Sequence, residues 1–474
     1  MSRKQNPPPP TGLVMSAYAN SIAYFFRHFW EEVDKIPDPR VRGRCIYGQR
    51  TLLATELARC FSGLESHRLM DAVFSNPGAA GNIGEICGED GGESAPRGDT
   101  INHWLARQET GHFQSLLDTM AFDLLRDKRL ERCREPLAGT MLMAADGTGL
   151  YCTVVPMPHS TTRRHRDGTV KYHSYVLLLA FVSPDGIIVP VACEFVENSE
   201  DYNPEFDKQD CEHKAEVKAF NAFKKRHPML PVTLLLDALS LDYTIMNLAR
   251  TLGWLFCICY RLEVSKGLDK EIERLLEAGR HESRETCVAS EDGTVTRTVY
   301  KWATLAYDFG AAGEKGATPI KVTYAEMESV TTNKDNEEVK RQKYQRVTNH
   351  KLNSGNIDDF FTYIGKTRWV EENQGFNEMK NLGLNIEHAY GYEGNSAPIH
   401  FVIAMIAFVI MQVTQKTDFF KKMLEETTGE VVVKTMRKLF DGIKAIARHF
   451  LDNLRNAGIQ RFDTARLRVR WDTS

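Results

Sequence analysis

Apolar residues recur at helical spacing in the first quarter of the chain. The spacing predicts helices between Met15 and about Phe74 and again between Ile101 and about Arg134. The intervening residues 75–99 are rich in Gly, Ser, Pro and acidic side chains, which are typical of a long flexible loop. Residues 1–135 are therefore predicted to form a helical domain that contains this loop.

The pattern changes at Met141, where short apolar runs bounded by turn residues predict strands. Met141–Ala145 runs into Asp146-Gly147-Thr148-Gly149, which we interpret as a strand that ends at a turn. The tetrapeptide Ser-Pro-Asp-Gly at 183–186 is a strong hairpin signal. The other expected elements are strands at Tyr172–Val182 and Ile187–Val196, a helix at Asp210–Arg226, a strand at Pro231–Leu236, a helix at Tyr243–Leu252 and a strand at Trp254–Tyr260.

Residues 266–350 have a different character. After one charged helix at Leu268–Ala278 come short runs rich in Thr, Val and Tyr, which predict a β-rich insertion. Helical periodicity returns at Asn356–Asn381, at Ile399–Val413 and over much of Asp418–Leu454. The predicted fold class is α/β: a mixed-sheet core in two parts (136–265 and 351–415), interrupted by the insertion and flanked by helical regions, the C-terminal one (416–474) being basic.

The composition is that of an ordinary globular protein: 42% of the 474 residues are hydrophobic and 26% are charged. The formal net charge of −3 means that a nucleic-acid partner would have to be met by local basic surfaces. The ten cysteines form no CxxC pair, and Cys257 and Cys259 are interpreted as packed thiols rather than metal ligands.

The chain gives no signal for export or for a membrane span. Met1–Gly12 is polar and contains the proline tract Pro7–Pro10, which predicts an extended segment. The longest apolar stretch, Ile399–Val413, is too short to cross a bilayer and predicts a buried helix. We therefore expect a cytoplasmic protein without membrane contact.

Two aspartates stand where catalytic side chains are well positioned. Asp146 and Asp237 each follow an apolar run that predicts a strand, so a rigid sheet would hold both. If the two strands are neighbours, the carboxylates converge, and their oxygens suit Mg²⁺ or Mn²⁺ better than zinc. The alternative is that each aspartate opens a turn or caps a helix.

A third acidic residue lies in a run that is compatible with a helix, from Arg368 to Lys380. Arg368 and Glu372 are four residues apart and share one helix face, and Lys380 lies eight residues further on. Without context, this run is equally compatible with an ordinary salt-bridged surface helix.

The segment Arg-Trp-Val-Glu-Glu-Asn-Gln-Gly-Phe-Asn-Glu-Met-Lys at 368–380 resembles the Arg-Trp-x-Ile-Glu-Asn-x-Gly-Phe-Asn-x-x-Lys signature of a group of bacterial insertion-sequence transposases. The likeness covers roughly Met141–Val413. It includes Asp146–Gly149, the segment Lys208-Gln209-Asp210-Cys211-Glu212, the strand at Leu234–Leu239, and Asn381, Gly383, Glu387 and His388. Departures are Ala238 where glycine is usual, Ser240 where tyrosine is usual and Glu371 where an aliphatic residue is usual.

The resemblance implies an RNase H-like core and an Asp-Asp-Glu triad made of Asp146, Asp237 and Glu372, with Asp146 bridging two Mg²⁺ or Mn²⁺ ions. Such a centre cuts DNA and joins the freed 3′-hydroxyl to a target. It also implies that Arg368 and Lys380 contact DNA phosphates, and that two copies of the chain act together on double-stranded DNA. No nucleotide cofactor is expected, because Gly310–Thr318 lacks the P-loop spacing.

Basic residues beside aromatic ones mark further candidate DNA contacts. They are Arg163, Arg164 and Arg166 between the first two strands and close to Asp146, Lys343, Tyr344 and Arg346 at the end of the β-rich insertion, Trp369, and the tail residues Arg461, Arg466, Arg468 and Arg470. The alternative for each cluster is a solvated charged surface. The helical domain is the natural candidate for binding the element's ends.

Two other functions remain open on the sequence alone. One is a domesticated or inactive relative that binds DNA without cutting it, and the other is a structure-selective nuclease on the same core. A glycosidase that pairs Asp146 with Glu372 is compatible with the spacing, but it leaves Asp237, Arg368 and Lys380 without a role.

Overall fold

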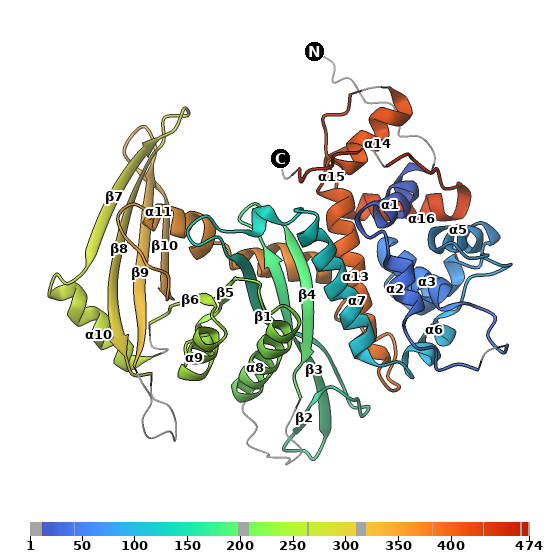
Figure 1. Ribbon diagram of the computed structural model, residues 1–474, viewed down its shortest axis with the longest axis horizontal. Helices are drawn as coiled ribbons and strands as arrows, with labels where there is room; N and C mark the ends of the chain where they lie inside the picture. Colours follow the sequence, from blue (N-terminus) through green and yellow to red (C-terminus); the bar gives the residue numbers. More distant parts are fainter. Residues whose placement is uncertain are drawn as a thin grey trace.

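The computed structural model describes residues 12–41, 43–197, 208–262, 265–309, 319–381, 383–429, 431–464 and 467–472. In the helix that begins at Lys208, side chains are described from Glu212 onward. The tract Pro7–Pro10, the segment Gly310–Thr318 and Arg466 lie outside these ranges. A single mixed sheet crosses the molecule, with a helical unit at one end and long antiparallel strands at the other (Figure 1). The expected α/β class is confirmed.

The N-terminal region is helical, as predicted. Its helices are α1 (Leu13–Phe25), α2 (Phe29–Asp34), α3 (Gln49–Phe61), α4 (His67–Val73), α5 (Pro77–Cys87), α6 (Gly98–Leu105) and α7 (Thr110–Arg126), followed by the 3₁₀ turn η1 (Glu131–Cys133).

The prediction of a flexible loop over residues 75–99 is wrong, because α5 occupies its first half. Asn76 caps this helix by accepting a hydrogen bond from the Gly78 amide (2.7 Å), and Gly88 ends it with φ of 72°. A Cβ on Gly84 would lie 2.3 Å from the backbone nitrogen of Gly91. Here the glycines permit close packing of backbone on backbone, so their abundance does not indicate flexibility.

The core of the sheet contains β1 (Met141–Thr153), β2 (Thr161–Arg164), β3 (Val170–Val182), β4 (Ile188–Phe195), β5 (Val232–Leu236) and β6 (Leu255–Cys259). Strand β3 is antiparallel to β1, β2 and β4, whereas β5 is parallel to both β1 and β6. Helices α8 (Lys208–Arg226) and α9 (Tyr243–Thr251) pack against this sheet. Each expected element of this region is therefore present.

Strand β1 does not end at Asp146 as predicted. It continues to Thr153, with Gly147 opposite Leu177 and Gly149 opposite Tyr175 of β3. The local Gly-Thr-Gly sequence favours a turn, but β3 pairs with β1 through Gly149 and, after a register shift, again at Cys152 and Thr153. Asp146 therefore lies within a strand.

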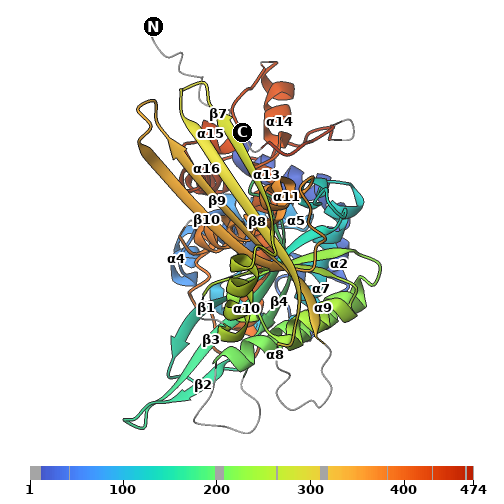
Figure 2. The same ribbon diagram turned by 90° about the vertical axis from the view of Figure 1, so that its left-hand side faces the viewer.

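The expected β-rich insertion consists of α10 (Lys266–Glu277), β7 (Glu282–Ala289), β8 (Val295–Tyr307), β9 (Ile320–Thr332) and β10 (Glu338–Thr348). Its four strands lie side by side as an antiparallel array (Figure 2). The end of β10 pairs with β6, with Val347 opposite Ile258, so the insertion extends the core sheet.

The segment after β10 is helical but irregular. It begins with α11 (Ile357–Asp359) and continues as the π-helical turns η3 (Phe360–Gly365) and η4 (Glu371–Phe376) and as α12 (Asn377–Asn381). Turn η4 packs against β1 and β4, where a Cβ on Gly375 would lie 3.3 Å from Ile188 Cδ1. Such π-helical turns are frequent at functional sites.

The last helices are α13 (Ser396–Gln415), α14 (Phe419–Thr428), α15 (Met436–Leu439) and α16 (Ile443–Asn456). Every residue of α13 is buried, which confirms the predicted buried helix. Among the described residues, α13 alone has the length and hydropathy of a membrane span, a test that the core helix of a soluble protein also passes. It packs against α1, α3, α6, α7 and β4 and so joins the helical unit to the sheet.

The N- and C-terminal helices form one unit. Asn453 of α16 accepts a hydrogen bond from the Val14 amide (3.1 Å), and Asn82 of α5 donates to the Leu454 carbonyl (2.8 Å). In the tail, Arg461 donates to the Glu85 carbonyl (2.7 Å), and the indole of Trp471 donates to the carbonyl of Arg129. The basic tail therefore folds back on the N-terminal helices.

Two hairpin turns with an Asp-Gly pair allow a matched test. Gly168 (φ +84°) has open space around an added Cβ, whereas a Cβ on Gly186 (φ +90°) would lie 2.0 Å from Oε1 of Gln374 in η4. We expect Gly168→Ala to reduce the free energy of unfolding by about 1–2 kcal/mol through backbone strain alone. Gly186→Ala should reduce the free energy of unfolding by about 1 kcal/mol more than Gly168→Ala does, because Gln374 must move. Urea unfolding measures both losses, and equal losses would contradict the contact between Gly186 and Gln374.

A buried histidine makes the fold sensitive to acid. His350 is buried beside Thr233, and burial lowers its pKa to about 4, an effect that the Glu135 carboxylate partly offsets. Between pH 6.5 and 4 the unfolded chain takes up a proton that the folded protein excludes, so stability falls by up to about 3 kcal/mol. Denaturation at several pH values should show a smaller loss for His350→Asn, whereas the exposed control His103→Asn should behave like the wild type.

Candidate active site

Asp146 and Asp237 lie side by side at one edge of the parallel strand pair. Ala144 of β1 is opposite Leu235 of β5, and each aspartate lies two residues further along its strand. Neighbouring strands are about 4.8 Å apart, and residues two apart point to the same face. The two strands are neighbours, which is the condition under which the sequence predicted that the carboxylates converge. Asp237 also caps the short turn η2 (Ala238–Ser240) by accepting a hydrogen bond from the Leu239 amide (2.8 Å).

A cavity of about 690 Å³ opens beside the two aspartates. Its wall includes Glu372 and also three other residues of the transposase-like segment, namely Arg368, Trp369 and Lys380. Cys259, Arg261, Asn373, Phe376, Asn377, Asn381, Gly147 and Thr148 complete it. The tertiary structure thus brings the three predicted acids to one concave surface from three separate elements.

Arg368 connects two of the three acids. Its guanidinium donates from Nη2 to Asp146 Oδ1 (2.9 Å) and from Nη1 to Glu372 Oε2 (3.3 Å), and the side chain is only 8% exposed. It also lies over the ring of Trp369, 5.6 Å from its centroid. The sequence predicts a phosphate contact for Arg368; in this conformation the residue instead supplies the positive charge between the carboxylates.

The electrostatics of Asp146 reflect this crowding. Burial raises its pKa to about 6; Arg368 opposes that shift, and the nearby carboxylates of Asp237 and Glu372 add to it. Converging carboxylates with one arginine between them are a donor set for hard divalent cations, because each added positive charge relieves the repulsion. The acids are oxygen donors of the kind that Mg²⁺ or Mn²⁺ takes, although within the described part of the chain their oxygens are not gathered within 4.8 Å of one another as the ligand atoms of Glu56, His67 and His400 are.

Glu371 and Glu372 occupy different environments although they are adjacent. Glu372 lines the cavity, and its side chain is 50% exposed. Glu371 is buried, and neither of its carboxyl oxygens has a hydrogen-bond partner among the described residues. Burial and the Asp146 carboxylate raise the pKa of Glu371 well above its usual range, and the Arg368 charge partly opposes them. The geometry thus places Glu372 at the cavity.

A smaller cavity of about 160 Å³ lies on the other side of the aspartate pair, towards α8. Its wall includes Tyr175, Glu212, His213, Glu216 and Ser240 as well as Asp146 and Asp237. Glu212 belongs to a segment of the sequence resemblance but is not among the predicted site residues, and neither are Glu216 and Tyr175. The available signal was the spacing of Glu212 and Glu216, four residues apart on one helix face.

The predicted DNA contacts near the insertion have mixed positions. Lys380 lines the large cavity and pairs with Glu387 (2.9 Å), and Lys343 is exposed and pairs with Glu326 (3.0 Å). Tyr344 is half-buried. Arg346 is buried and donates to the Gly365 carbonyl (2.6 Å), so it ties β10 to η3 and is not an accessible DNA contact in this structure.

Arg163, Arg164 and Arg166 are exposed on the β2–β3 hairpin, as a DNA contact requires. Arg163 lies opposite Lys171 of β3, whereas Asp146 lies opposite Leu178. Seven residues of strand separate these positions, roughly 23 Å. The expectation that this cluster is close to Asp146 is therefore wrong, because β1 continues as a strand beyond the aspartate.

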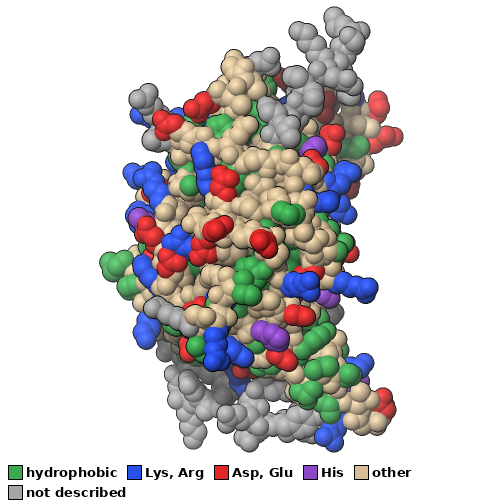
Figure 3. All heavy atoms as spheres, turned by 90° about the vertical axis from the view of Figure 1, so that its right-hand side faces the viewer, with side chains coloured by type: hydrophobic (Ala, Val, Ile, Leu, Met, Phe, Trp, Pro, Cys, Tyr) green, Lys and Arg blue, Asp and Glu red, His purple; other side chains and the backbone are tan. Residues whose placement is uncertain are grey.

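The helical end of the molecule carries intermixed charges. Figure 3 shows Lys and Arg side chains interspersed with Asp and Glu over this face, without a continuous basic surface. The predicted role of this region in binding DNA ends thus has no support from its charge distribution on the visible face.

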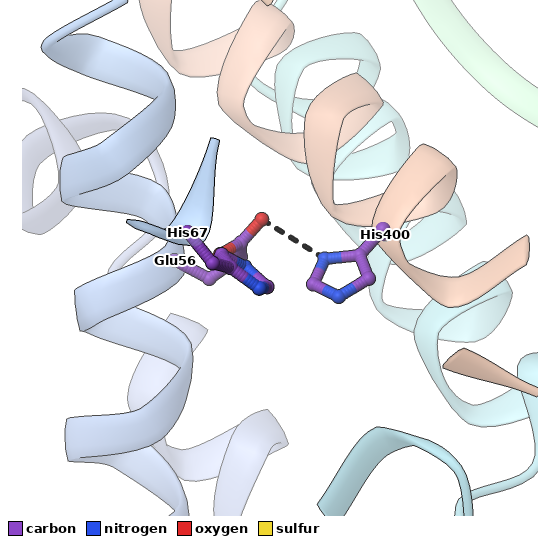
Figure 4. A group of neighbouring side chains, drawn as sticks. All are labelled: Glu56, His67 and His400. Atoms are coloured by element: carbon purple, nitrogen blue, oxygen red, sulfur yellow. Dashed lines mark hydrogen bonds and ion pairs between the residues drawn. The ribbon is translucent and has the colours of Figure 1, made fainter. Parts of the chain in front are cut away.

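A second group of potential metal ligands lies inside the helical unit, where Glu56, His67 and His400 meet (Figure 4). Glu56 Oε1 lies 2.9 Å from His400 Nδ1 and accepts a hydrogen bond from Arg59 Nε (2.8 Å), and Glu56 Oε2 lies 3.1 Å from His67 Nε2. Arg59 is fully buried and already balances the glutamate charge. A divalent ion here would add uncompensated charge to the interior, so we interpret the cluster as structural.

Comparison with protein-family models finds none that matches this chain, and comparison with curated proteins finds no match either. The functional interpretation therefore rests on the residues of the cavity.

Proposed function

We propose that this protein is a DNA transposase of the Asp-Asp-Glu class with an RNase H-like core. The observation that carries the proposal is the convergence of Asp146, Asp237 and Glu372 on one cavity together with Arg368 and Lys380. The meander β1–β3–β4, followed by α8, parallel strand β5, α9 and parallel strand β6, supports the same core.

In this proposal Asp146, Asp237 and Glu372 would hold two Mg²⁺ or Mn²⁺ ions. When bound, such ions polarise a phosphodiester, lower the pKa of a water nucleophile and stabilise the leaving 3′-oxygen. Asp146 of β1, whose pKa is raised by burial and by the charges of both other acids, would hold the ions together with them.

The remaining cavity residues have roles towards DNA and towards the acids. Arg368 holds Asp146 and Glu372 in position by two ion pairs. Lys380 and Arg261 place positive charge on the same wall, where it can meet phosphates, and Trp369 offers a ring on which an unpaired base can stack. Synapsis of two DNA ends calls for two copies of the chain.

The test uses DNA from the native locus that contains the gene and the flanking sequence on both sides. This DNA is incubated with purified protein and Mg²⁺ or Mn²⁺. Metal-dependent cuts at discrete edges, followed by joining of the 3′ ends to a target plasmid, are expected. Cutting without joining would favour a structure-selective nuclease, and binding without cutting would favour a domesticated or inactive relative. If the protein neither binds nor cuts this DNA, the proposal is refuted.

A further inference from the structure

The smaller cavity shares Asp146 and Asp237 with the larger one but is closed on its far side by α8. Glu212 and Glu216 project into it from successive turns of this helix. Four carboxylates thus line a space of about 160 Å³, and no Lys or Arg side chain is among the described residues of its wall. A space of this size holds roughly five water molecules.

Glu216 is the most unusual of these groups. The residue is only 5% exposed, and its Oε1 accepts a hydrogen bond from Ser240 Oγ (2.7 Å). Its Oε2 has no hydrogen-bond partner within the described part of the chain. Burial raises the pKa of Glu216 to about 8, and an unmet oxygen on such a buried carboxyl group is costly unless a proton, a cation or a water completes it.

The surrounding residues keep the cavity narrow and acidic. A Cβ on Gly147 would lie 2.7 Å from the ring of Tyr175, so glycine is what allows this ring to lie across β1. His213, the one potentially basic group on the wall, lies 3.0 Å from the Leu239 carbonyl and 3.5 Å from the Asp242 carboxylate. The ring of His213 therefore interacts with groups other than the four acidic side chains that line the cavity.

We propose that Glu212 and Glu216 are ligands of a divalent cation, Mg²⁺ or Mn²⁺, bound on the α8 side of Asp146 and Asp237. The inference rests on the proposed function, because it assigns one ion of the metal centre to carboxylates outside the Asp-Asp-Glu triad. The Glu216 oxygen that has no hydrogen-bond partner would bind the ion, and Glu212 would supply a second carboxylate ligand from the preceding turn of α8.

The experiment is Mn²⁺ binding to the full chain without DNA, measured by electron paramagnetic resonance. Wild type is compared with Glu212→Gln, Glu216→Gln and the double variant. We expect each single variant to weaken one Mn²⁺ site by about tenfold or more and the double variant to lose that site. The control is Glu194→Gln. Glu194 lies on β4 and pairs with Lys218 of α8, but it lines neither cavity, so this variant should bind Mn²⁺ as the wild type does.

A second measurement uses only the wild type, so it tests the inference even if the variants do not fold. With Fe²⁺ in place of Mn²⁺ and hydrogen peroxide added as the oxidant, oxidation of the bound Fe²⁺ to Fe³⁺ converts peroxide into hydroxide and a hydroxyl radical. These radicals should cut the backbone near Glu216 and Ser240 as well as near Asp146. Unchanged Mn²⁺ binding in the double variant, or no cut at α8, would overturn the inference. Intact α8-dependent binding without any DNA cleavage would overturn the proposed function alone.

Discussion

Asp146→Asn, Asp237→Asn and Glu372→Gln are each expected to reduce metal-dependent DNA cleavage by about a thousandfold or more. Each substitution removes a charge that the cavity uses to hold a cation, and stabilisation of transition-state charge by bound metal contributes several kcal/mol, about 4 kcal/mol being a thousandfold in rate. Single-turnover cleavage of end DNA measures the effect. The fold should remain intact, because the three side chains meet at a cavity and not in the apolar core.

Glu371→Gln is the matched control, one residue away from Glu372. Glu371 is buried and its pKa is raised well above the usual range, so glutamine is a close replacement for its protonated form, and we expect less than about a tenfold change in cleavage. Binding of DNA in the absence of metal should persist in all four variants. Normal cleavage by the three triad variants would refute the assignment, and a large loss in Glu371→Gln alone would move the third ligand by one residue.

Glu56→Met is expected to lower the free energy of unfolding by about 3–5 kcal/mol. The substitution leaves Arg59 charged and fully buried without its carboxylate partner, which is among the most costly changes in a protein interior. It also removes the acceptor that faces His67 and His400, which lie on α4 and α13 (Figure 4). Urea unfolding followed by circular dichroism measures the loss.

The double variant Glu56→Met/Arg59→Met separates the ion pair from simple loss of packing. Replacing both partners removes the unpaired charge, so the double variant should be more stable than Glu56→Met, although it carries one more substitution. If the losses simply add, the pair is not coupled and the cluster contributes only through its volume.

Much of the architecture could be predicted because local signals agreed with the tertiary contacts. The run Val232–Leu236 is apolar at every position except Thr233, and in the structure it is a central strand buried on both faces. The Ser-Pro-Asp-Gly turn at 183–186 has the backbone conformation that its glycine predicted, with φ of +90°. The same local signals predicted that Asp146 and Asp237 each follow an apolar run, whereas the pairing of the two strands is known only from the structure.

The failures occurred where a distant partner overrode a local preference. Gly84 and Gly91 favour a loop by composition, but they meet where two backbone segments pack closely. Gly147 and Gly149 favour a turn, but β3 extends β1 past them. Arg346 belongs to a basic run that favours a surface position, yet its guanidinium is buried against the Gly365 carbonyl. Each outcome depends on residues that are remote in sequence.

The sequence by itself determined which residues can carry the chemistry, because a carboxylate that follows an apolar strand and a Glu four residues after an Arg are local patterns. Only the tertiary structure decided how those residues combine. It joined Arg368 to Asp146 across 222 positions of the chain, buried Glu371 while leaving Glu372 at the cavity, and placed Glu216 behind the aspartate pair. Burial and charge–charge distance depend on packing between distant segments, and no local pattern encodes them.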